Sequence, residues 1–175
     1  MAMPQLKDII AENLILLFVG YNPGLRSAAV GHHFAGPSNR FWKLLHEAGL
    51  TPDRMVAEED EDVLGLGYGL TNLVARPTRA AAELTSAEYR AGAEILRQKL
   101  LTYRPRIVCY VGIGVYRAFA RVRRCDYGLQ PTAVVPGVAD FVAPSPSGLN
   151  RMPYAEMLNI YRQLAGLVEQ ARRDQ

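Results

Sequence analysis

The sequence has few of the residues that build disulfide or metal centres. Among its 175 residues are two cysteines and three histidines. Cys109 and Cys125 are too few for a disulfide framework or a four-ligand metal cluster, and Cys109 lies in an apolar run that is typical of a core thiol. The adjacent His32 and His33 would point apart in an extended segment. We therefore expect no metal site and no cofactor.

Long apolar runs are also absent. No stretch approaches the roughly 20 apolar residues that a membrane span requires, and residues 1–8 lack the basic-then-apolar pattern of a signal peptide. We therefore expect no membrane partner and a cytoplasmic protein, associated with the nucleoid if it is bacterial. Charge of one sign is scarce too, because 20 Lys and Arg against 17 Asp and Glu leave a net charge of only +3. That balance by itself is weak evidence for nucleic-acid binding.

The charges that are present are unevenly distributed. Acidic residues crowd into residues 58–62, where we expect a solvated surface run. Arginines, which suit bidentate phosphate contacts, stand at Arg117, Arg121, Arg123 and Arg124, and again at Arg151. Two interpretations of the 117–124 cluster remain open, a phosphate-binding surface and a solvated helix face.

Several common catalytic motifs are missing. The sequence contains neither a GxxxxGK[ST] phosphate loop nor a GxSxG nucleophile elbow. Residues 112–114 (Gly-Ile-Gly) lack the third glycine and the spaced acid of a dinucleotide fingerprint, so they indicate nucleotide binding only weakly. No repeat, linker or low-complexity segment interrupts the chain, and we expect residues 1–175 to form one domain.

The apolar pattern predicts strands that alternate with helices. Strands are expected at 14–19, 69–75 and 106–111, with a last strand or hairpin at 132–136 and 139–143. Helices are expected at about 41–48, 85–103, 113–121 and 153–172; residues 38–40 would cap the first, and a capping box at 85–88 would open the second. Residues 25–38 read as a loop. This order is typical of a three-layer α/β/α sandwich with a mainly parallel central sheet.

Two loops follow expected strands, and in a parallel sheet both would lie at the carboxyl edge, where ligands bind. In the first, residues 20–24 (GYNPG), Asn22 offers an amide that cannot ionise near neutral pH. It could orient a water molecule or read a polar edge, or it could simply form the turn. Phe34, in the glycine-rich segment that follows, could stack on a planar ring or fill the core. The second loop, residues 144–151, presents Leu149 beside Arg151.

Together, GYNPG, residues 32–43 (HHFAGPSNRFWK), residues 69–74 with Arg76-Pro77-Thr78, and residues 145–151 (SPSGLNR) resemble the mismatch-specific uracil-DNA glycosylases, a family that includes the thymine-DNA glycosylases. The similarity runs from about Leu14 to the last helix. It implies a uracil-DNA glycosylase-like α/β/α fold. It also implies a monofunctional enzyme of base excision repair that flips uracil, mispaired with guanine, out of double-stranded DNA and hydrolyses its N-glycosidic bond.

The resemblance also implies roles for particular residues. Asn22 would position the attacking water, and Phe34 would stack on the flipped pyrimidine. Amides near Tyr21 would contact a carbonyl of the base. The set expected to bind the substrate is Gly20, Tyr21, Ser27, Phe34 and Asn72. The set expected to insert into DNA and contact the mismatched strand is Ser145, Ser147, Gly148, Leu149, Asn150 and Arg151, with Leu149 as the wedge.

The sequence departs from the family pattern at two positions. Ser145 stands where some members carry Asn, and Asn72 stands where some carry Lys. The motif loops contain no lysine, which argues against a Schiff-base nucleophile, and the cysteine count excludes an iron–sulfur glycosylase.

Several points remain open at this level. Asp60 or Asp62 could supplement Asn22 in activating the water, and clearance around Ser27 and Phe34 would set the range of bases. A monomer is expected. The alternatives are a DNA-damage recognition module of the same fold without catalysis, and a small-molecule enzyme that binds a nucleotide at residues 112–114.

Overall fold

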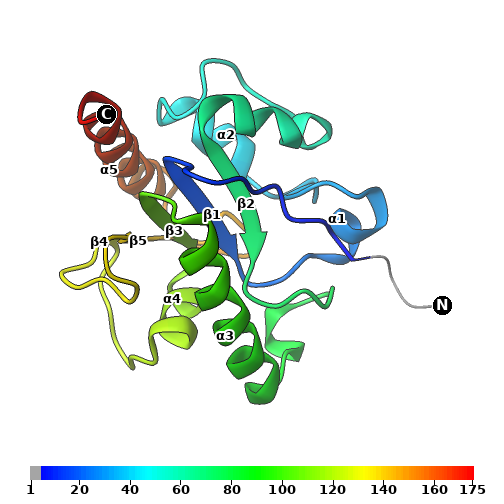
Figure 1. Ribbon diagram of the computed structural model, residues 1–175. Coiled ribbons are helices and arrows are strands. Elements are labelled where there is room, and N and C mark those ends of the chain that lie inside the picture. The colour runs from blue at the N-terminus through cyan, green and yellow to red at the C-terminus, as the bar shows by residue number, and fades with distance from the viewer. Residues whose placement is uncertain (1–4) are drawn as a thin grey trace.

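The computed structural model describes residues 5–175, and five strands within that range form one sheet. The sheet has the order β2-β1-β3-β5-β4 (Figure 1). Its parallel members are β1 (Leu16–Gly20), β2 (Tyr68–Asn72), β3 (Ile107–Val111) and β5 (Ala139–Ala143), and β4 (Gly128–Leu129) pairs antiparallel with β5. The predicted α/β fold with a mainly parallel sheet is confirmed.

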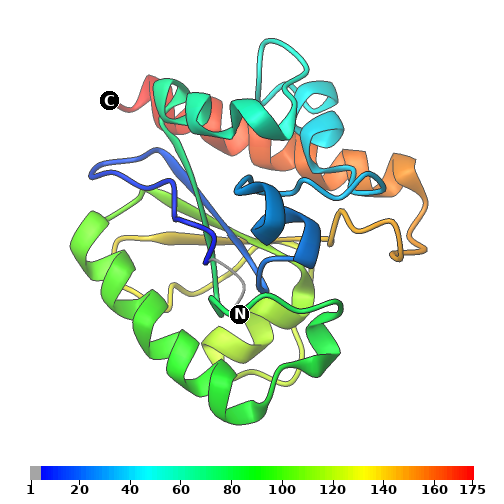
Figure 2. The same cartoon turned by 90° about the vertical axis from the view of Figure 1, so that its right-hand side faces the viewer.

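Helices cover both faces of the sheet. The α-helices are α1 (Leu25–Val30), α2 (Phe41–Glu47), α3 (Ser86–Tyr103), α4 (Ile113–Ala120) and α5 (Tyr154–Arg173), and the short 3₁₀ helices are η1 (Ala57–Leu66) and η2 (Ala81–Glu83). Figure 2 shows α2 and α5 above the sheet and α3 and α4 below it. None of the helices built from residues 5–175 combines the length and the apolar character that a membrane crossing needs.

The continuous apolar run of β1 divides between two cores. Leu16 and Phe18 pack into the core beneath α2 and α5, whereas Leu17 and Val19 pack into the core against α3 and α4. Successive side chains of a strand point to opposite faces, so a strand covered on both faces must be apolar at every position. This is why residues 14–19 show no polar alternation.

Two predicted helix starts are formed by the expected residues. At α3, Thr85 Oγ1 accepts a hydrogen bond from Glu88 N (3.2 Å) and the Glu88 carboxylate accepts one from Thr85 N (2.8 Å), which completes the capping box. At α2, the side chain of Asn39, two residues before the helix begins, accepts from Phe41 N at 2.9 Å. Both arrangements pair main-chain N–H groups that a first helical turn leaves without partners.

Two predictions of local structure are wrong. Residues 25–38 begin with the short helix α1 instead of a loop throughout. Residues 132–136 form no strand, and the antiparallel partner of β5 is β4 at residues 128–129. Pro131 and Pro136 lack an N–H for a ladder. The segment is held instead by the buried Asp140 carboxylate, which accepts from Val134 N at 3.0 Å.

Candidate functional site

A pocket of about 530 Å³ opens at the carboxyl edge of the sheet. The parallel register places Gly20 beside Asn72 there, and Figure 2 shows α1, the start of α2 and the segment after β5 gathered at this end. Most of the residues predicted for the site line the pocket, namely Gly20, Tyr21, Asn22, Ser27, Phe34, Asn72, Ser145, Ser147, Leu149 and Asn150. Gly148 and Arg151 do not line it; both are exposed beside it.

The amide of Asn22 is held in one orientation. Its Nδ2 donates to the main-chain oxygen of Arg76 and to Thr78 Oγ1, both at 2.8 Å. A carbonyl oxygen can only accept, and Thr78 Oγ1 gives its own proton to Ala80 O at 2.8 Å. Asn22 must therefore present its nitrogen to both partners. Its Oδ1 has no hydrogen-bond partner among residues 5–175 and is free to accept from a water in the pocket.

The ring of Phe34 is supported from behind. Phe41 stacks on it with ring centroids 3.8 Å apart and planes 12° from parallel. Phe41 covers one face, so Phe34 meets the pocket through its other face or its edge. Phe34 has a φ of 52°, a conformation that bulky side chains rarely adopt. The strain is held by hydrogen bonds on either side, including one from Ala35 N to Ser27 Oγ at 3.0 Å.

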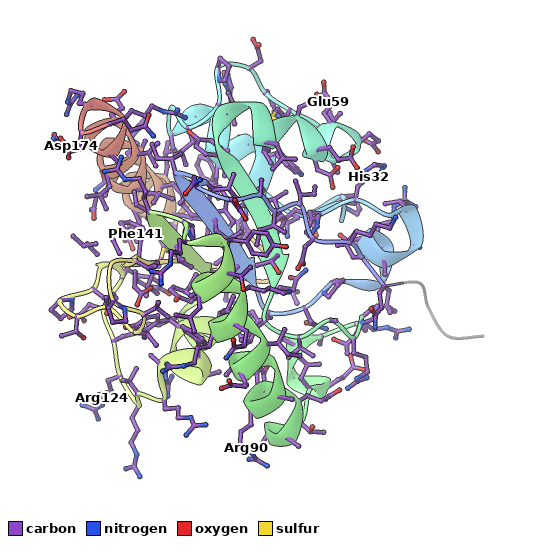
Figure 3. The ribbon with its side chains drawn as sticks, viewed as in Figure 1. His32, Glu59, Arg90, Arg124, Phe141 and Asp174 are labelled. Atoms are coloured by element: carbon purple, nitrogen blue, oxygen red, sulfur yellow. The ribbon has the colours of Figure 1, made fainter. Side chains whose placement is uncertain are left out.

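The acidic run contributes one buried carboxylate to this support, which corrects part of the expectation of a solvated run. Asp60 is only 1% exposed, whereas its four acidic neighbours in residues 58–62 are exposed. It accepts from His33 N at 2.8 Å and lies 3.1 Å from His32 Nδ1 (Figure 3 labels His32 and the nearby Glu59). Asp60 does not line the pocket. Its oxygens hold the main chain before Phe34, which leaves it poorly placed to activate water.

His33 is a neutral, buried side chain. Burial lowers its pKa below the ordinary value. Its Nε2 lies 2.8 Å from the main-chain oxygen of Lys7, which can only accept, so Nε2 carries the proton. Trp42 Nε1 donates to the oxygen of His33 at 3.2 Å. Among residues 5–175, no group of three or more His, Cys, Asp or Glu side chains is arranged to bind a metal ion.

Asn72 offers a second amide to the pocket. Its Oδ1 would lie 2.7 Å from a Cβ built on Gly20, so a side chain at position 20 would displace it. The same Cβ would lie 3.7 Å from Phe34 Cζ, which places Gly20 between the amide and the ring. The Asn72 side chain makes no hydrogen bond to another of residues 5–175, and it can pair with a polar edge that enters the pocket.

Gly112 and Gly114, which only weakly indicated nucleotide binding, make room for the side chain of Tyr21. A Cβ on Gly112 would lie 2.7 Å from the Tyr21 ring, and a Cβ on Gly114 would overlap the Tyr21 hydroxyl. The tyrosine fills the space that a phosphate would need, so the nucleotide-enzyme alternative is not supported. Burial raises the pKa of Tyr21, and its phenol stays neutral.

Leu149 is the exposed tip of the second loop. Its side chain is 88% exposed, the highest value among the exposed large apolar residues of the described chain. The loop closely approaches the segment that precedes α2, since a Cβ on Gly148 would lie 2.8 Å from Ser38 Cβ. Leu149 also lines the pocket, so this exposed apolar side chain stands at the pocket entrance.

The sequence analysis missed several residues of the pocket. Thr78 and the oxygen of Arg76 hold Asn22, although the motif gave them no role. Arg26 and Arg79 stand on the pocket wall, and neither forms an ion pair or a side-chain hydrogen bond with another of residues 5–175. Single arginines separated by more than fifty residues leave no sequence signal, because only folding brings them to one opening.

A sequence model of the Uracil DNA glycosylase superfamily matches residues 8–165, a span that includes both loops of the pocket. The chain belongs to this superfamily. The mixed α/β fold, with a five-stranded and mostly parallel sheet flanked by helices, matches the fold of this superfamily.

A solved structure is also similar. A protein from Methanosarcina acetivorans, provisionally named a uracil DNA glycosylase, has a solution NMR structure that matches with a TM-score of 0.62 at 21% sequence identity. The match covers 94% of this chain and 99% of that one. At this sequence identity the similarity supports the fold and gives no information about the substrate of this chain.

Proposed function

We propose that the protein is a monofunctional DNA glycosylase that removes uracil mispaired with guanine from double-stranded DNA, acting as a monomer. The observation that carries the proposal is the locked amide of Asn22, whose Oδ1 is free in a pocket that also holds Phe34 and Asn72. Membership in the uracil-DNA glycosylase superfamily supports the reaction class. The preference for a mismatch rests on the resemblance of the two loops to the mismatch-specific family.

In the proposed reaction, Asn22 Oδ1 accepts a hydrogen bond from water and aims the water oxygen at C1′ of the flipped nucleotide. The C1′–N1 bond breaks, its electron pair leaves with the pyrimidine, and the water oxygen bonds to C1′ and loses its proton to solvent. Positive charge develops on the sugar and negative charge on the base. An amide removes no proton efficiently, so we expect slow turnover.

The pocket walls match a flipped pyrimidine. Phe34, supported by Phe41, provides a flat stacking surface, and the Asn72 amide can pair with a carbonyl or N–H of the base. Main-chain amides near Tyr21 would stabilise the leaving anion, and removing one such donor typically costs about 2.7–4 kcal/mol of transition-state stabilisation. Ser27 and Phe34 would set how much space a 5-substituent has.

The surface around the opening matches a duplex from which one base has been removed. Leu149 would enter the stack in place of the flipped base and offset an unstacking cost of roughly a few kcal/mol. Its neighbours, among them Ser147, Gly148, Asn150 and Arg151, would contact the widowed guanine and its strand. Arg26 and Arg79 would contact phosphates on other sides of the opening.

The lining argues for hydrolysis without strand cleavage. No lysine of residues 5–175 lines the pocket, so no amine is placed to form a Schiff base with the sugar.

Asp62 is exposed and does not line the pocket. We therefore expect Asp62→Asn to leave the excision rate unchanged, and Asn22 to orient the water without a carboxylate.

The test uses labelled duplexes with G·U, G·T, A·U or G·C at one position, followed by alkali to cut abasic sites. Wild type should release uracil from G·U fastest, and Asn22→Ala should abolish release while DNA binding persists. Cutting before alkali would contradict the monofunctional reaction. Equal release from G·U and A·U would contradict the mismatch preference. Binding without any release would favour a recognition module.

A further inference from the structure

The segment that carries Leu149 makes several internal hydrogen bonds, although its tip is exposed. Within it, Asn150 N donates to Ser147 O at 3.0 Å and Asn150 Nδ2 donates to Ser145 O at 2.9 Å. These bonds shape the turn, but both ends of each lie within the segment. They cannot fix where the turn stands relative to the pocket. We call residues 144–151 the wedge loop.

Arg40 makes the hydrogen bonds that tie the central part of the wedge loop, residues 146–150, to the start of α2. Tyr161 Oη also donates to Pro144 O, at the beginning of the loop, at 2.8 Å. Arg40 Nη2 donates to Ser147 O at 2.7 Å and to Asn150 O at 3.1 Å, and its Nε lies 3.5 Å from Pro146 O. Its main-chain N–H also donates to Pro146 O at 3.0 Å. Arg40 forms no ion pair with a carboxylate among residues 5–175. The cation therefore binds the peptide dipoles of one loop, with charge-assisted hydrogen bonds that are stronger than neutral ones.

The support beneath Arg40 is rigid. Arg40 directly precedes α2, where Phe41, Leu44 and Leu45 are fully buried. The two residues that follow it serve the other wall of the pocket, since Phe41 stacks on Phe34 and Trp42 Nε1 donates to His33 O. Consecutive side chains at one helix start thus hold both the wedge loop and the stacking ring. The start of α2 therefore fixes the distance between the wedge loop and the ring of Phe34.

We infer that Arg40 is a positioning residue that presets the wedge loop, so that Leu149 enters the duplex as the base reaches Phe34. The inference rests on the proposed function. A loop already ordered in the free protein loses little conformational freedom on binding, which is the general benefit of preorganisation. Methionine at position 40 would keep a long apolar stem and remove every guanidinium donor.

A double-mutant cycle tests this inference. Single-turnover uracil release from a G·U duplex is measured for wild type, Arg40→Met, Leu149→Ala and the double variant. Misplacement of a positioned group can lower rates by up to about 100-fold, so we expect Arg40→Met to be roughly 10- to 100-fold slower than wild type. If Arg40 acts through the wedge, the double variant is no slower than the slower single variant. Multiplying effects, or a wild-type rate for Arg40→Met, would overturn the inference.

Arg172→Met is the matched control. Arg172 Nη2 also donates to a main-chain oxygen, that of Leu66, just before β2 and at the opposite edge of the sheet from the pocket. It should keep the wild-type rate. Thermal unfolding of each variant shows whether the fold is intact.

Hydrogen exchange separates failure of this inference from failure of the proposed function. In Arg40→Met, the amides of residues 147–150 should exchange faster than in wild type, while those of β1 and β3 stay protected. An inactive wild type would contradict the proposed function, and the exchange result would still decide whether Arg40 holds the loop. Unchanged exchange at 147–150 would overturn the inference.

Discussion

At the scale of single residues, the direction of the Asn22 amide depends on the hydroxyl of Thr78, to which the sequence resemblance assigned no role. Thr78 Oγ1 donates its own hydrogen to Ala80 O, so it can only accept a hydrogen bond from Asn22, and Asn22 must offer Nδ2. A bare asparagine in a turn could present either end of its amide to the pocket. The orientation of the amide, on which the proposed role of Asn22 depends, is therefore set by Thr78 and the Arg76 carbonyl.

Thr78→Val should slow uracil release by roughly 10-fold, because a donor left without its partner costs about 1–3 kcal/mol and Asn22 would be oriented by the Arg76 oxygen alone. Affinity for the duplex should not change. Single-turnover rates and DNA titrations measure the two effects. Thr78→Ser keeps the hydroxyl and should retain most of the rate. Equal losses in both variants would show that the methyl group matters instead of the hydrogen bond.

The excision rate should be nearly independent of pH from about 6.5 to 9, since the amide of Asn22 does not titrate. His33, which lines the pocket, has its pKa lowered by burial and is neutral over this range. The pKa of Tyr21 is raised by burial, so its phenol does not ionise there. Single-turnover rates across this range provide the measurement. A tenfold rise in rate per pH unit would reveal a titrating general base and contradict the assignment to Asn22.

At the scale of elements, the start of α4 is shaped by the loop after β1. Gly112 has a φ of 126° and, with Gly114, leaves room for the Tyr21 ring. The sequence pattern Gly-Ile-Gly at a strand-to-helix junction looks the same whether the space holds a phosphate or a side chain. Only the packing of Tyr21 distinguishes the two cases.

Gly114→Ala should destabilise the protein by about 1–3 kcal/mol, because the added methyl group overpacks a filled space. Urea unfolding measures the change. Tyr21→Leu removes the clashing hydroxyl, so Gly114→Ala should cost much less stability in that background. Gly166→Ala is the matched control within α5, where a Cβ meets nothing within 4 Å; it should stabilise the protein by roughly 0.5–1 kcal/mol. An equal cost of Gly114→Ala in both backgrounds would contradict the Tyr21 contact.

Asp140, which lies in β5 and accepts a hydrogen bond from the segment before it, contributes a pH-dependent term to stability. Burial raises the pKa of this carboxyl, although the hydrogen bonds from Val134 N and Tyr110 oppose the shift. A raised folded-state pKa gives a contribution that is complete below the unfolded-state pKa of about 3.9 and is lost as pH rises through the folded value.

Wild type should therefore lose stability relative to Asp140→Asn as pH increases above the unfolded-state pKa of about 3.9. Urea unfolding of both proteins at several pH values measures this difference. The variant can still be less stable than wild type at every pH. Tyr110 Oη and Val134 N both donate to the carboxylate, and the NH₂ group of an asparagine amide could not accept from one of them. A difference that stays constant, or that grows in favour of wild type, would show that the pKa of Asp140 is not raised.

At the scale of the whole molecule, charge is arranged around the pocket although the net charge is small. Arg26 and Arg79 stand on its wall, whereas Arg117, Arg121, Arg123 and Arg124 are exposed and do not line it. Arg124 projects from the loop after α4 into solvent (Figure 3). This placement favours the solvated-surface interpretation of the 117–124 cluster.

Arg26→Gln and Arg79→Gln should each reduce the slope of log affinity against log salt by about 1, the effect of losing one phosphate contact. Fluorescence titrations of a G·U duplex at several salt concentrations measure the slope. The paired variant Arg123→Gln with Arg124→Gln should leave it unchanged. A reduced slope in that control would place the 117–124 cluster on the DNA.

The layers of the fold and the two loops at the pocket could be predicted from the amino-acid sequence alone. Alternating buried strands and amphipathic helices have strong periodic signals, and the ordered motifs fall at strand ends, so Asn22, Phe34 and Leu149 could be named before folding. The hydrogen-bond partners of the polar groups at the site depend on the tertiary structure. Asp60 is buried while its neighbours are solvated, Thr78 orients Asn22, and Arg40 binds the wedge loop more than a hundred residues away. Hydrogen bonds between distant segments leave no periodicity in a sequence, because they depend on distances that exist only after the chain has folded.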